Sequence, residues 1–373
     1  MQSYQIAPIP ADGIGPEVTE QAVKVLNAIA MNFDHKFSYK YADVGAIAID
    51  NHKEPLPQST LEVCKNTDAI LFGAIGDPKY DNDPTAKIRP EQGLLKLRKE
   101  LNLFANIRPV KAYKTLLDKS PLRKKIIKGT DISIYRELTG GLYFGEKKLS
   151  KDGNTASDLC TYSRFEIERI SHLAFKAAEL RKMKVTLVDK ANVLESSRLW
   201  RKVVTEIGTQ YPKVELDFLF IDNAAMQMIQ NPRQFDVILT ENLFGDIISD
   251  EASVIGGSIG LLSSASVGKK YAMFEPIHGS YPQATGKGIA NPIASILSAA
   301  MLLDHFTLFK EAKMIRKAVD KSLKLQITTP DLNKKFDNVT TSKVGDFIED
   351  FINNPEDSNL NFSNIYLGQS TII

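Results

Sequence analysis

The chain has 373 residues, which exceeds one ordinary domain and favours two. Its composition, 43% hydrophobic and 25% charged, is typical of a globular protein that buries a sizeable core. The 47 basic and 45 acidic side chains leave a net charge of +2, which argues against nucleic acid or an anionic membrane as the main partner.

The cysteines, the N-terminus and the apolar stretches together predict the compartment. Cys64 and Cys160 show no metal-binding or redox-motif spacing, which fits a reducing compartment. The N-terminus enters an apolar strand without the charged and long hydrophobic regions of a signal peptide. The longest apolar stretch, residues 289–303, contains Asn291 and Pro292 and is not expected to span a bilayer. We therefore expect a cytoplasmic protein with no membrane partner.

In chain order, short apolar runs alternate with amphipathic stretches. The predicted strands cover residues 69–74, 185–188, 216–221 and 237–240, and the predicted helices cover residues 17–31, 165–182, 196–208 and 291–309. This alternation predicts an α/β fold with a largely parallel sheet, in which ligands collect at the carboxyl ends of the strands. The Gly-, Lys- and Ser-rich segment 143–161 indicates an extended arm, and the Asn- and Ser-rich tail after Asn353 indicates poor order.

The first turn of the chain is Asp-Gly-Ile-Gly-Pro-Glu at residues 12–17, with Pro16 suited to the first turn of a helix. It is similar to the dinucleotide fingerprint G-x-G-x-x-G, but Val18 occupies the place of the third glycine. No acidic residue follows at the expected distance after a second strand. We interpret the segment as a tight turn, so the sequence predicts no Rossmann motif.

Two aspartates follow the apolar run at residues 235–239. The run stops at Thr240, a Gly turn is expected next, and Asp246 and Asp250 then lie four residues apart in a helical pattern. Two carboxylates on one helix face repel each other unless a cation lies between them, and Mg²⁺ or Mn²⁺ prefers such oxygen ligands. The alternative is that Asp246 caps the helix and Asp250 is solvated.

Further charged residues stand at the edges of apolar runs. Arg108 and Arg136 need anionic partners there, either structural carboxylates or a substrate with two carboxylates. Lys190, beyond a predicted strand, is either solvated or a general base near a cation. Asp222 also terminates a predicted strand and is a possible third metal ligand. Tyr143 follows two glycines that would let the backbone approach a ligand closely, and its alternative is ordinary packing.

A loop rich in Gly and Pro, residues 274–292, precedes a helix of small residues. Such a loop can enclose a nucleotide with main-chain donors, and His278 offers a flat ring. The alternative is a long surface loop, which at this length is often functional as well.

Taken together, these segments resemble the β-decarboxylating dehydrogenase family, which includes isocitrate, isopropylmalate, homoisocitrate and tartrate/malate dehydrogenases. The resemblance extends from the N-terminal strand to about Phe347, and its specific strings are residues 104–109, 136–145, 189–193, 241–253 and 275–280. It implies the two-domain fold of that family. Residues 1–103 and 257–373 would form a discontinuous cofactor-binding domain. Residues 104–256 would form an inserted domain for substrate, metal and dimerisation, with its arm near residues 143–161.

The resemblance also implies roles for individual residues. Substrate contacts are implied for Arg98, Arg108, Arg136, Asp222 and Leu94. Acid–base catalysis is implied for Lys190 and Tyr143, and Mg²⁺ or Mn²⁺ binding for Asp222, Asp246 and Asp250. NAD contacts are implied for Gly76, Glu91, Glu275, His278, Gly279, Ser280, Gln283, Gly286 and Asn291. Because Lys190 and Asp222 reach the partner's site in this family, a homodimer with shared active sites is implied.

Glu91 and Leu94 separate the branches of the family. Isocitrate-specific members have Ser and Asn in this segment, whereas the present pair resembles isopropylmalate-specific members of leucine biosynthesis. Leu94 offers an apolar contact to an isopropyl group, and Glu91 repels an extra carboxylate. The alternatives are a D-malate or tartrate decarboxylating dehydrogenase and a catalytically silent regulatory subunit.

Two positions depart from the family pattern. Ala11 replaces the first glycine of the usual Pro-Gly-Asp-Gly-Ile-Gly turn, which raises a question of backbone strain. Gln283 stands where NAD-using members have an aspartate, and no cation replaces it. NAD is therefore favoured over NADP.

Overall fold

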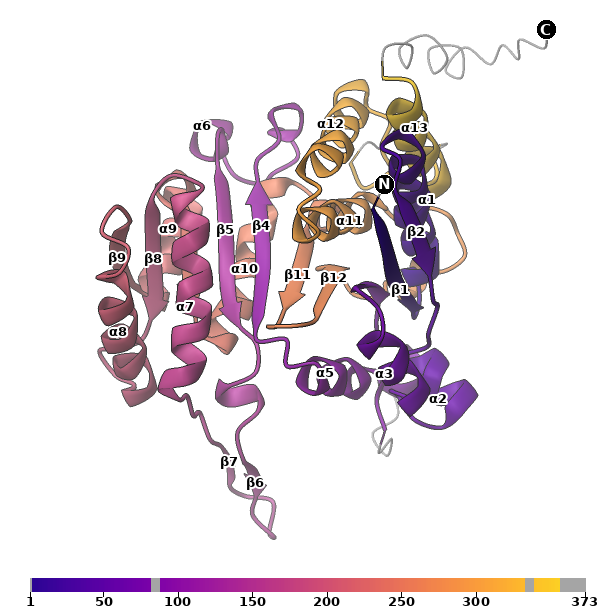
Figure 1. Cartoon of the computed structure of the whole chain (residues 1–373). Coiled ribbons are helices and arrows are strands. Elements are labelled where there is room, and N and C mark those ends of the chain that lie inside the picture. The colour runs from indigo at the N-terminus through magenta and orange to yellow at the C-terminus, as the bar shows by residue number, and fades with distance from the viewer. Residues whose placement is uncertain (1, 82–87, 333–338, 356–373) are drawn as a thin grey trace, which may run out of the picture. The chain divides into compact units, whose positions relative to one another are not determined.

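The computed structural model describes residues 2–81, 88–332 and 339–355, so most of the predicted tail lies outside the described residues. The chain divides into two compact units (Figure 1). The first unit runs to Leu97 and includes 260–263 and the chain from Met273, whereas the second comprises 98–259 and 264–272.

The boundaries between these units differ slightly from the predicted domain boundaries, which lie between residues 103 and 104 and between residues 256 and 257. Residues 264–272 belong to the second unit because strand β11 (Ser263–Val267) pairs with strand β4 (Ala105–Lys111).

The described part of the first unit contains a parallel sheet in the order β2-β1-β3-β12. Its strands are β1 (Ser3–Ala11), β2 (Lys36–Tyr39), β3 (Ala69–Ala74) and β12 (Ala272–Pro276). Its helices are α1 (Gly15–Asn32), α2 (Ala46–His52), α3 (Gln58–Lys65), α4 (Pro78–Asp81), α5 (Pro90–Glu100, which continues into the second unit), α11 (Ile293–His305), α12 (Phe309–Leu325) and α13 (Thr341–Asn353). Helix α1 packs on β1 and β3 and against α11 and α13. Every residue of β3 is buried, as expected for a parallel strand covered on both faces.

The described part of the second unit contains a sheet in the order β11-β4-β5-β10-β8-β9. Its remaining strands are β5 (Asp131–Glu137), β8 (Lys184–Asp189), β9 (Glu215–Phe220) and β10 (Val237–Thr240). Its helices are α6 (Lys124–Ile127), α7 (Arg164–Glu179), α8 (Glu195–Gly208), α9 (Ile221–Gln230) and α10 (Asn242–Gly256). Strand β4 runs antiparallel to β5 and β11, and the pairings among β5, β10, β8 and β9 are parallel. The fold is α/β with mostly parallel strand pairing, as predicted.

Alternating residues of the central strands cover the two faces of this second sheet. Leu187 and Leu239 pack under α7 and α8, whereas Val188 and Ile238 pack under α9 and α10. Because successive side chains of a strand point to opposite faces, an unbroken apolar run is what a doubly covered strand requires. This packing holds the carboxyl ends of β8 and β10, and the residues that follow them, in fixed positions.

The predicted arm is a hairpin of β6 (Lys147–Leu149) and β7 (Ala156–Asp158), which extends from the rest of the second unit (Figure 1). The predicted helix 291–309 is wrong in extent. Helix α11 ends at His305, and α12 begins at Phe309, because Thr307 adopts a left-handed conformation with φ of 61° that interrupts the helix. No helix in the described ranges combines the length and hydropathy needed to cross a membrane.

The first turn has the predicted form, since α1 begins at Gly15 with a proline in its first turn. Ala11 has a φ of 56°, so the residue that replaces the usual glycine does adopt the left-handed conformation that disfavours a Cβ.

Candidate functional site

Helix α10 carries Asp246 and Asp250, and the predicted helical spacing is confirmed. The predicted Gly turn before them is wrong, because the helix already begins at Asn242 and Gly245 lies in its first turn. A Cβ on Gly245 would stand 2.6 Å from Cγ and 2.7 Å from Cβ of Arg136. The glycine is therefore needed for the close approach of Arg136 to the helix.

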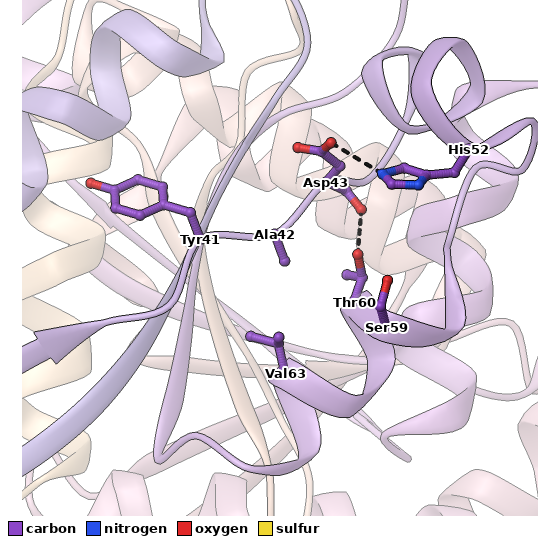
Figure 2. A pocket seen from close by; sticks show the side chains of 7 residues that line it. All are labelled: Tyr41, Ala42, Asp43, His52, Ser59, Thr60 and Val63. Carbon is purple, nitrogen blue, oxygen red and sulfur yellow. Dashed lines mark hydrogen bonds and ion pairs between the residues drawn. The ribbon is translucent and has the colours of Figure 1, made fainter.

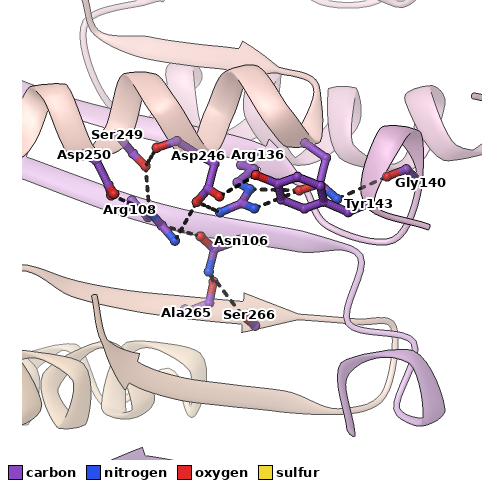
Figure 3. Close-up of polar contacts among 11 residues, drawn as sticks. Asn106, Arg108, Arg136, Gly140, Tyr143, Asp246, Ser249, Asp250, Ala265 and Ser266 are labelled. Atoms are coloured by element: carbon purple, nitrogen blue, oxygen red, sulfur yellow. Dashed lines mark hydrogen bonds and ion pairs between the residues drawn. The ribbon is translucent and has the colours of Figure 1, made fainter. Parts of the chain in front are cut away.

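Arg108 and Arg136 meet the two aspartates beneath α10 (Figure 3). Arg136 Nη1 donates to Asp246 Oδ1, and Arg108 Nη2 lies 3.7 Å from the same oxygen. Arg108 Nη1 lies 3.3 Å from Asp250 Oδ1. Both guanidinium groups are buried, and the carboxylates that the sequence assigned to a metal are their counter-ions within the chain.

Arg136 stays cationic in this environment. Burial, followed by the positive charge of Arg108, lowers the pKa of Arg136 to about 10, and the Asp246 carboxylate opposes that shift. The guanidinium is therefore charged at neutral pH.

Tyr143 completes the same cluster. Its hydroxyl donates to Asp246 Oδ2 over 2.8 Å, and its ring faces the Arg136 guanidinium. Burial, and then the bond to Asp246, raises the pKa of Tyr143 above its ordinary value, which keeps the phenol protonated. The preceding glycines pack on Tyr162, since a Cβ on Gly141 would lie 2.1 Å from its hydroxyl oxygen.

Lys190 and Asp222 form a separate pair. Lys190 Nζ lies 2.7 Å from Asp222 Oδ1, and this bond lowers the pKa of Asp222. Asp222 does not end a strand as predicted, because β9 stops at Phe220 and Asp222 lies in the first turn of α9. Within the described ranges of one chain, no group of three His, Cys, Asp or Glu side chains is placed to hold a metal ion. The predicted trio of aspartates is thus not assembled by a single chain.

Helix α5 carries three residues that were predicted to contact the substrate or the cofactor. Glu91, Leu94 and Arg98 are spaced three and four residues apart, so they share a helix face, and all three are half-buried. The face is fixed by close packing, because a Cβ on Gly93 would lie 2.3 Å from the carbonyl oxygen of Pro55.

The predicted cofactor residues lie in the first unit. Gly76 has a φ of 115°, and a Cβ there would stand 2.9 Å from Glu91 Oε1, so the glycine allows the close approach of Glu91 to this segment. The Gly76 N–H donates to Asp12 Oδ2 over 3.0 Å, as does the N–H of Ala46. Desolvation raises the pKa of Asp12 against the effect of these bonds. Asp12 thus anchors this segment, a role that its place in the first turn did not reveal.

In the loop after β12, one buried side-chain nitrogen lacks a hydrogen-bond partner in the described structure, and other polar groups are hydrogen-bonded within the chain. His278 Nε2 is buried and has no hydrogen-bond partner in the described structure, and a Cβ on Gly279 would meet open space. Burial lowers the pKa of His278, which favours the neutral form of the ring. The Ser280 carbonyl accepts from the Ile14 N–H over 2.9 Å, which ties the loop to the first turn, and Glu275 is buried at the end of β12.

Other donors of this loop are already used within the chain. The N–H groups of Gly286 and Gly288 donate to the two carboxylate oxygens of Glu17. Asn291 accepts from the Ile293 N–H at the start of α11 and donates to Asp331. Main-chain donation to a nucleotide was expected at Gly286, so Glu17 is a competing acceptor that the sequence did not identify.

A surface cavity of about 270 Å³ lies elsewhere in the first unit (Figure 2). It is lined by Tyr41, Ala42, Asp43, His52, Ser59, Thr60 and Val63. None of these is a predicted site residue, and the Asp43–His52 pair at its edge is exposed. The cavity therefore does not contribute to the assignment of the site.

The described fold is α/β, and the cluster on α10 brings two buried arginines against two aspartates and a tyrosine. Residues 5–348 match the isocitrate/isopropylmalate dehydrogenase family, and the chain belongs to that family of oxidoreductases.

Relatives named 3-isopropylmalate dehydrogenase are similar to the chain over most of their length. The 3-isopropylmalate dehydrogenase of Bacteroides fragilis is 55% identical over 94% of this chain and 99% of its own. That of Bacillus subtilis is 52% identical over 91% and 94%. Among solved structures, isocitrate dehydrogenase from Methylococcus capsulatus has a TM-score of 0.83 at 33% identity, covering 94% of this chain and 99% of that one. A β-decarboxylating dehydrogenase from Thermococcus kodakarensis has a TM-score of 0.79 at 36% identity, covering 99% and 100%.

Proposed function

We propose that the chain catalyses the NAD-dependent oxidative decarboxylation of 3-isopropylmalate to 4-methyl-2-oxopentanoate and CO₂, a step of leucine biosynthesis. The observation that carries the proposal is the cluster of Arg108, Arg136, Tyr143, Asp246 and Asp250 in one unit, in a chain 55% identical to a 3-isopropylmalate dehydrogenase. Buried arginines suit a dicarboxylate substrate, and adjacent aspartates suit a divalent cation.

The residues fit the proposed metal and cofactor. Asp246 and Asp250 offer hard oxygen ligands, and Asp222 of a second subunit would complete the set for Mg²⁺ or Mn²⁺. The open space beside Gly279 and the buried Nε2 of His278, which has no hydrogen-bond partner in the described structure, suit the approach of NAD. When bound, NAD accepts a hydride, and the cation acidifies the 2-hydroxyl group of the substrate and stabilises developing negative charge.

The side chains of the protein then have distinct tasks. Arg98, Arg108 and Arg136 bind and orient the carboxylates of the substrate. Lys190 accepts the proton of the 2-hydroxyl group as the hydrogen on C2 leaves as hydride, which gives a β-keto acid. Loss of CO₂ leaves an enolate, and Tyr143, held protonated by burial and Asp246, donates a proton to its carbon.

Specificity for the isopropyl group is assigned to Leu94 and Glu91 of α5. A half-buried leucine gives an alkyl substituent an apolar contact, and the neighbouring carboxylate disfavours a third carboxylate. D-Malate lacks the alkyl group and therefore gains nothing from Leu94.

The preference for NAD is assigned to the position of Gln283. Gln283 is exposed on the loop after β12, and a neutral amide can bond ribose hydroxyls but does not pair with a 2′-phosphate. We expect kcat/KM with NAD to exceed kcat/KM with NADP, and a clear preference for NADP would contradict this assignment.

The proposed active form is a homodimer with shared sites in the cytoplasm. Met226 and Ile229 of α9, and Ile247 and Val254 of α10, are exposed apolar side chains on two packed helices. Each pair repeats at helical spacing, so each lies on one helix face. A second copy of the chain would cover these faces and bring its Lys190 and Asp222 to the α10 cluster. Both cysteines are free thiols, in keeping with a reducing compartment.

The test is a screen of the purified chain with 3-isopropylmalate, D-malate, tartrate and isocitrate, each with NAD or NADP and with Mg²⁺ or Mn²⁺. We expect the highest kcat/KM for 3-isopropylmalate with NAD, and no turnover after EDTA until a divalent cation is restored. A higher kcat/KM for D-malate would assign the chain to the other branch, and no turnover of any substrate would indicate a regulatory subunit.

A further inference from the structure

Two buried asparagines hydrogen-bond to the two arginines of the site, and Figure 3 labels one of them, Asn106, beside Arg108. Asn106, on β4, is 1% exposed, and Asn242, the first residue of α10, is fully buried. Neither side chain contacts the aspartates directly in the described structure. Their partners are the backs of the two guanidinium groups.

Asn242 joins three parts of the site. Its Oδ1 accepts from Arg136 Nε over 3.0 Å and from Arg136 Nη2 over 2.8 Å. Its Nδ2 donates to the Gly140 carbonyl over 3.1 Å, at the start of the turn that carries Tyr143. Its backbone N–H donates to the hydroxyl of Tyr162 over 2.9 Å. With Nε and Nη2 occupied, Nη1 is the nitrogen directed at Asp246.

Asn106 repeats this arrangement at the second arginine. Its Oδ1 accepts from Arg108 Nε over 2.7 Å, and its Nδ2 donates to Ser266 Oγ on β11 over 3.1 Å. Arg108 Nη1 is then directed at Ser249 and Asp250 of α10. In both cases an amide oxygen binds the guanidinium from behind, and the amide nitrogen is fixed to a neighbouring element.

An arginine side chain has several rotatable bonds, and its guanidinium binds a carboxylate well only in one plane. An acceptor on Nε fixes that plane before the substrate arrives, which reduces the cost of ordering the side chain upon binding. The aspartates cannot supply this restraint if they bind a metal. The asparagines are neutral, so they orient the arginines without cancelling the positive charge that attracts the substrate.

We propose that Asn242 and Asn106 are positioning residues that hold Arg136 and Arg108 in the orientation for binding the carboxylates of the substrate. This inference rests on the proposed function. Asn242 additionally couples Arg136 to the turn of Tyr143, so it is the more informative of the two.

The main variant is Asn242→Leu, which has a similar volume and no polar atoms. We expect the KM for 3-isopropylmalate to rise at least about tenfold, whereas the KM for NAD changes less than about threefold. Asn242→Asp retains an oxygen acceptor for Arg136 but adds a negative charge and loses the donor to Gly140, so we expect it to restore only part of the loss in KM. Asn106→Leu and Asn106→Asp should show the same difference at Arg108.

The matched control is Thr186→Val on β8 of the same unit. Thr186 is buried, and its hydroxyl has no hydrogen-bond partner in the described structure, so the change removes a buried polar atom without touching the site. We expect unchanged kinetics. Binding of 3-isopropylmalate, followed as the rise in Tm that it causes, gives a second readout that does not depend on turnover, and it should weaken in Asn242→Leu.

The outcomes distinguish a failure of the proposed function from a failure of the positioning role of the asparagines. If the wild-type chain does not turn over 3-isopropylmalate, the proposed function fails. If the wild-type chain is active, and a folded Asn242→Leu keeps the wild-type KM, the positioning role is refuted. Should Asn242→Leu fail to fold, Asn242→Ser, which is too short to reach the guanidinium, replaces it.

Discussion

Glu241 is the single residue between β10 and α10. Its side chain carries an ionisable group, yet the residue is only 3% exposed. Burial, with a further contribution from the charge of Asp189, raises the pKa of Glu241 from 4.5 to about 7. It accepts a hydrogen bond from Ser197, whose oxygen in turn accepts from the backbone N–H of Lys190. A single carboxyl group thus connects the start of α10 with the end of β8.

This pKa predicts a dependence of stability on pH. The folded chain binds the proton of Glu241 more tightly than the unfolded chain, so the contribution is complete below pH 4.5 and is lost as the pH rises to about 7. The full difference is about 3 kcal/mol in the free energy of unfolding. Glu241→Gln removes the titration. We expect urea unfolding from pH 4.5 to 8 to show a flatter profile for the variant, and parallel profiles would contradict the assignment.

Lys190 and Tyr143 have polar partners but no large packing role, since both are partly exposed. We expect Lys190→Met and Tyr143→Phe to fold normally and to lose turnover by about 10²- to 10⁴-fold, because each removes a proton-transfer group. The measurements are kcat with saturating substrate and Tm for folding. Near-wild-type kcat in both variants would remove these residues from the mechanism.

At the scale of elements, the position of helix α10 depends on a residue without a side chain in its first turn, Gly245. Gly245 leaves room for Arg136, and this role is invisible in the sequence, where the glycine suggested a turn. The chemistry-bearing side chains of α10 follow from its helical spacing. Its position against β5 follows from packing of Ile248, Ala252 and Ile255 into the apolar cluster beneath it.

Gly245→Ala tests this arrangement. The added Cβ would overlap the Arg136 side chain, so we expect a loss of about 1–3 kcal/mol in the free energy of unfolding together with a rise in KM for the substrate. Ser253→Ala on the same helix is the control and should change neither by much. Wild-type stability and KM in Gly245→Ala would show that Arg136 moves aside without consequence.

Element boundaries were predictable where a local signal marks them. The apolar run 69–74 is β3 without change, and the capping residue Ser163 precedes α7 by one residue. The end of α11 was not predictable, because Thr307 is not a typical left-handed residue, and apolar residues continue past it into α12.

At the scale of the whole molecule, the proposed site needs two chains. Asp222 and Lys190 pair with each other, away from the aspartates of α10, and the apolar faces of α9 and α10 are exposed in one chain. A homodimer with shared sites accounts for both observations.

Subunit mixing tests the shared site. Coexpressed Lys190→Met and Asp246→Asn chains would form heterodimers with one intact and one doubly defective site. Since heterodimers make up half of a random mixture, we expect about a quarter of wild-type activity from two inactive variants. Each variant expressed by itself is the control. If the purified heterodimer has no activity, Lys190 and Asp246 serve the same chain's site, and the shared site is wrong.

The sequence by itself determined the α/β class and the aspartate pair on one helix face, because both follow from residue periodicity, which is a local property. The roles of the arginines, the lysine and the tyrosine are implied by the family resemblance and stay predictions. The tertiary structure decided which other residues hold the charged side chains of the site in place. Arg136 and Asn242 are 106 residues apart, and no local pattern shows that an amide restrains a guanidinium across that separation. Such contacts depend on strand register and helix packing, which only the folded chain specifies.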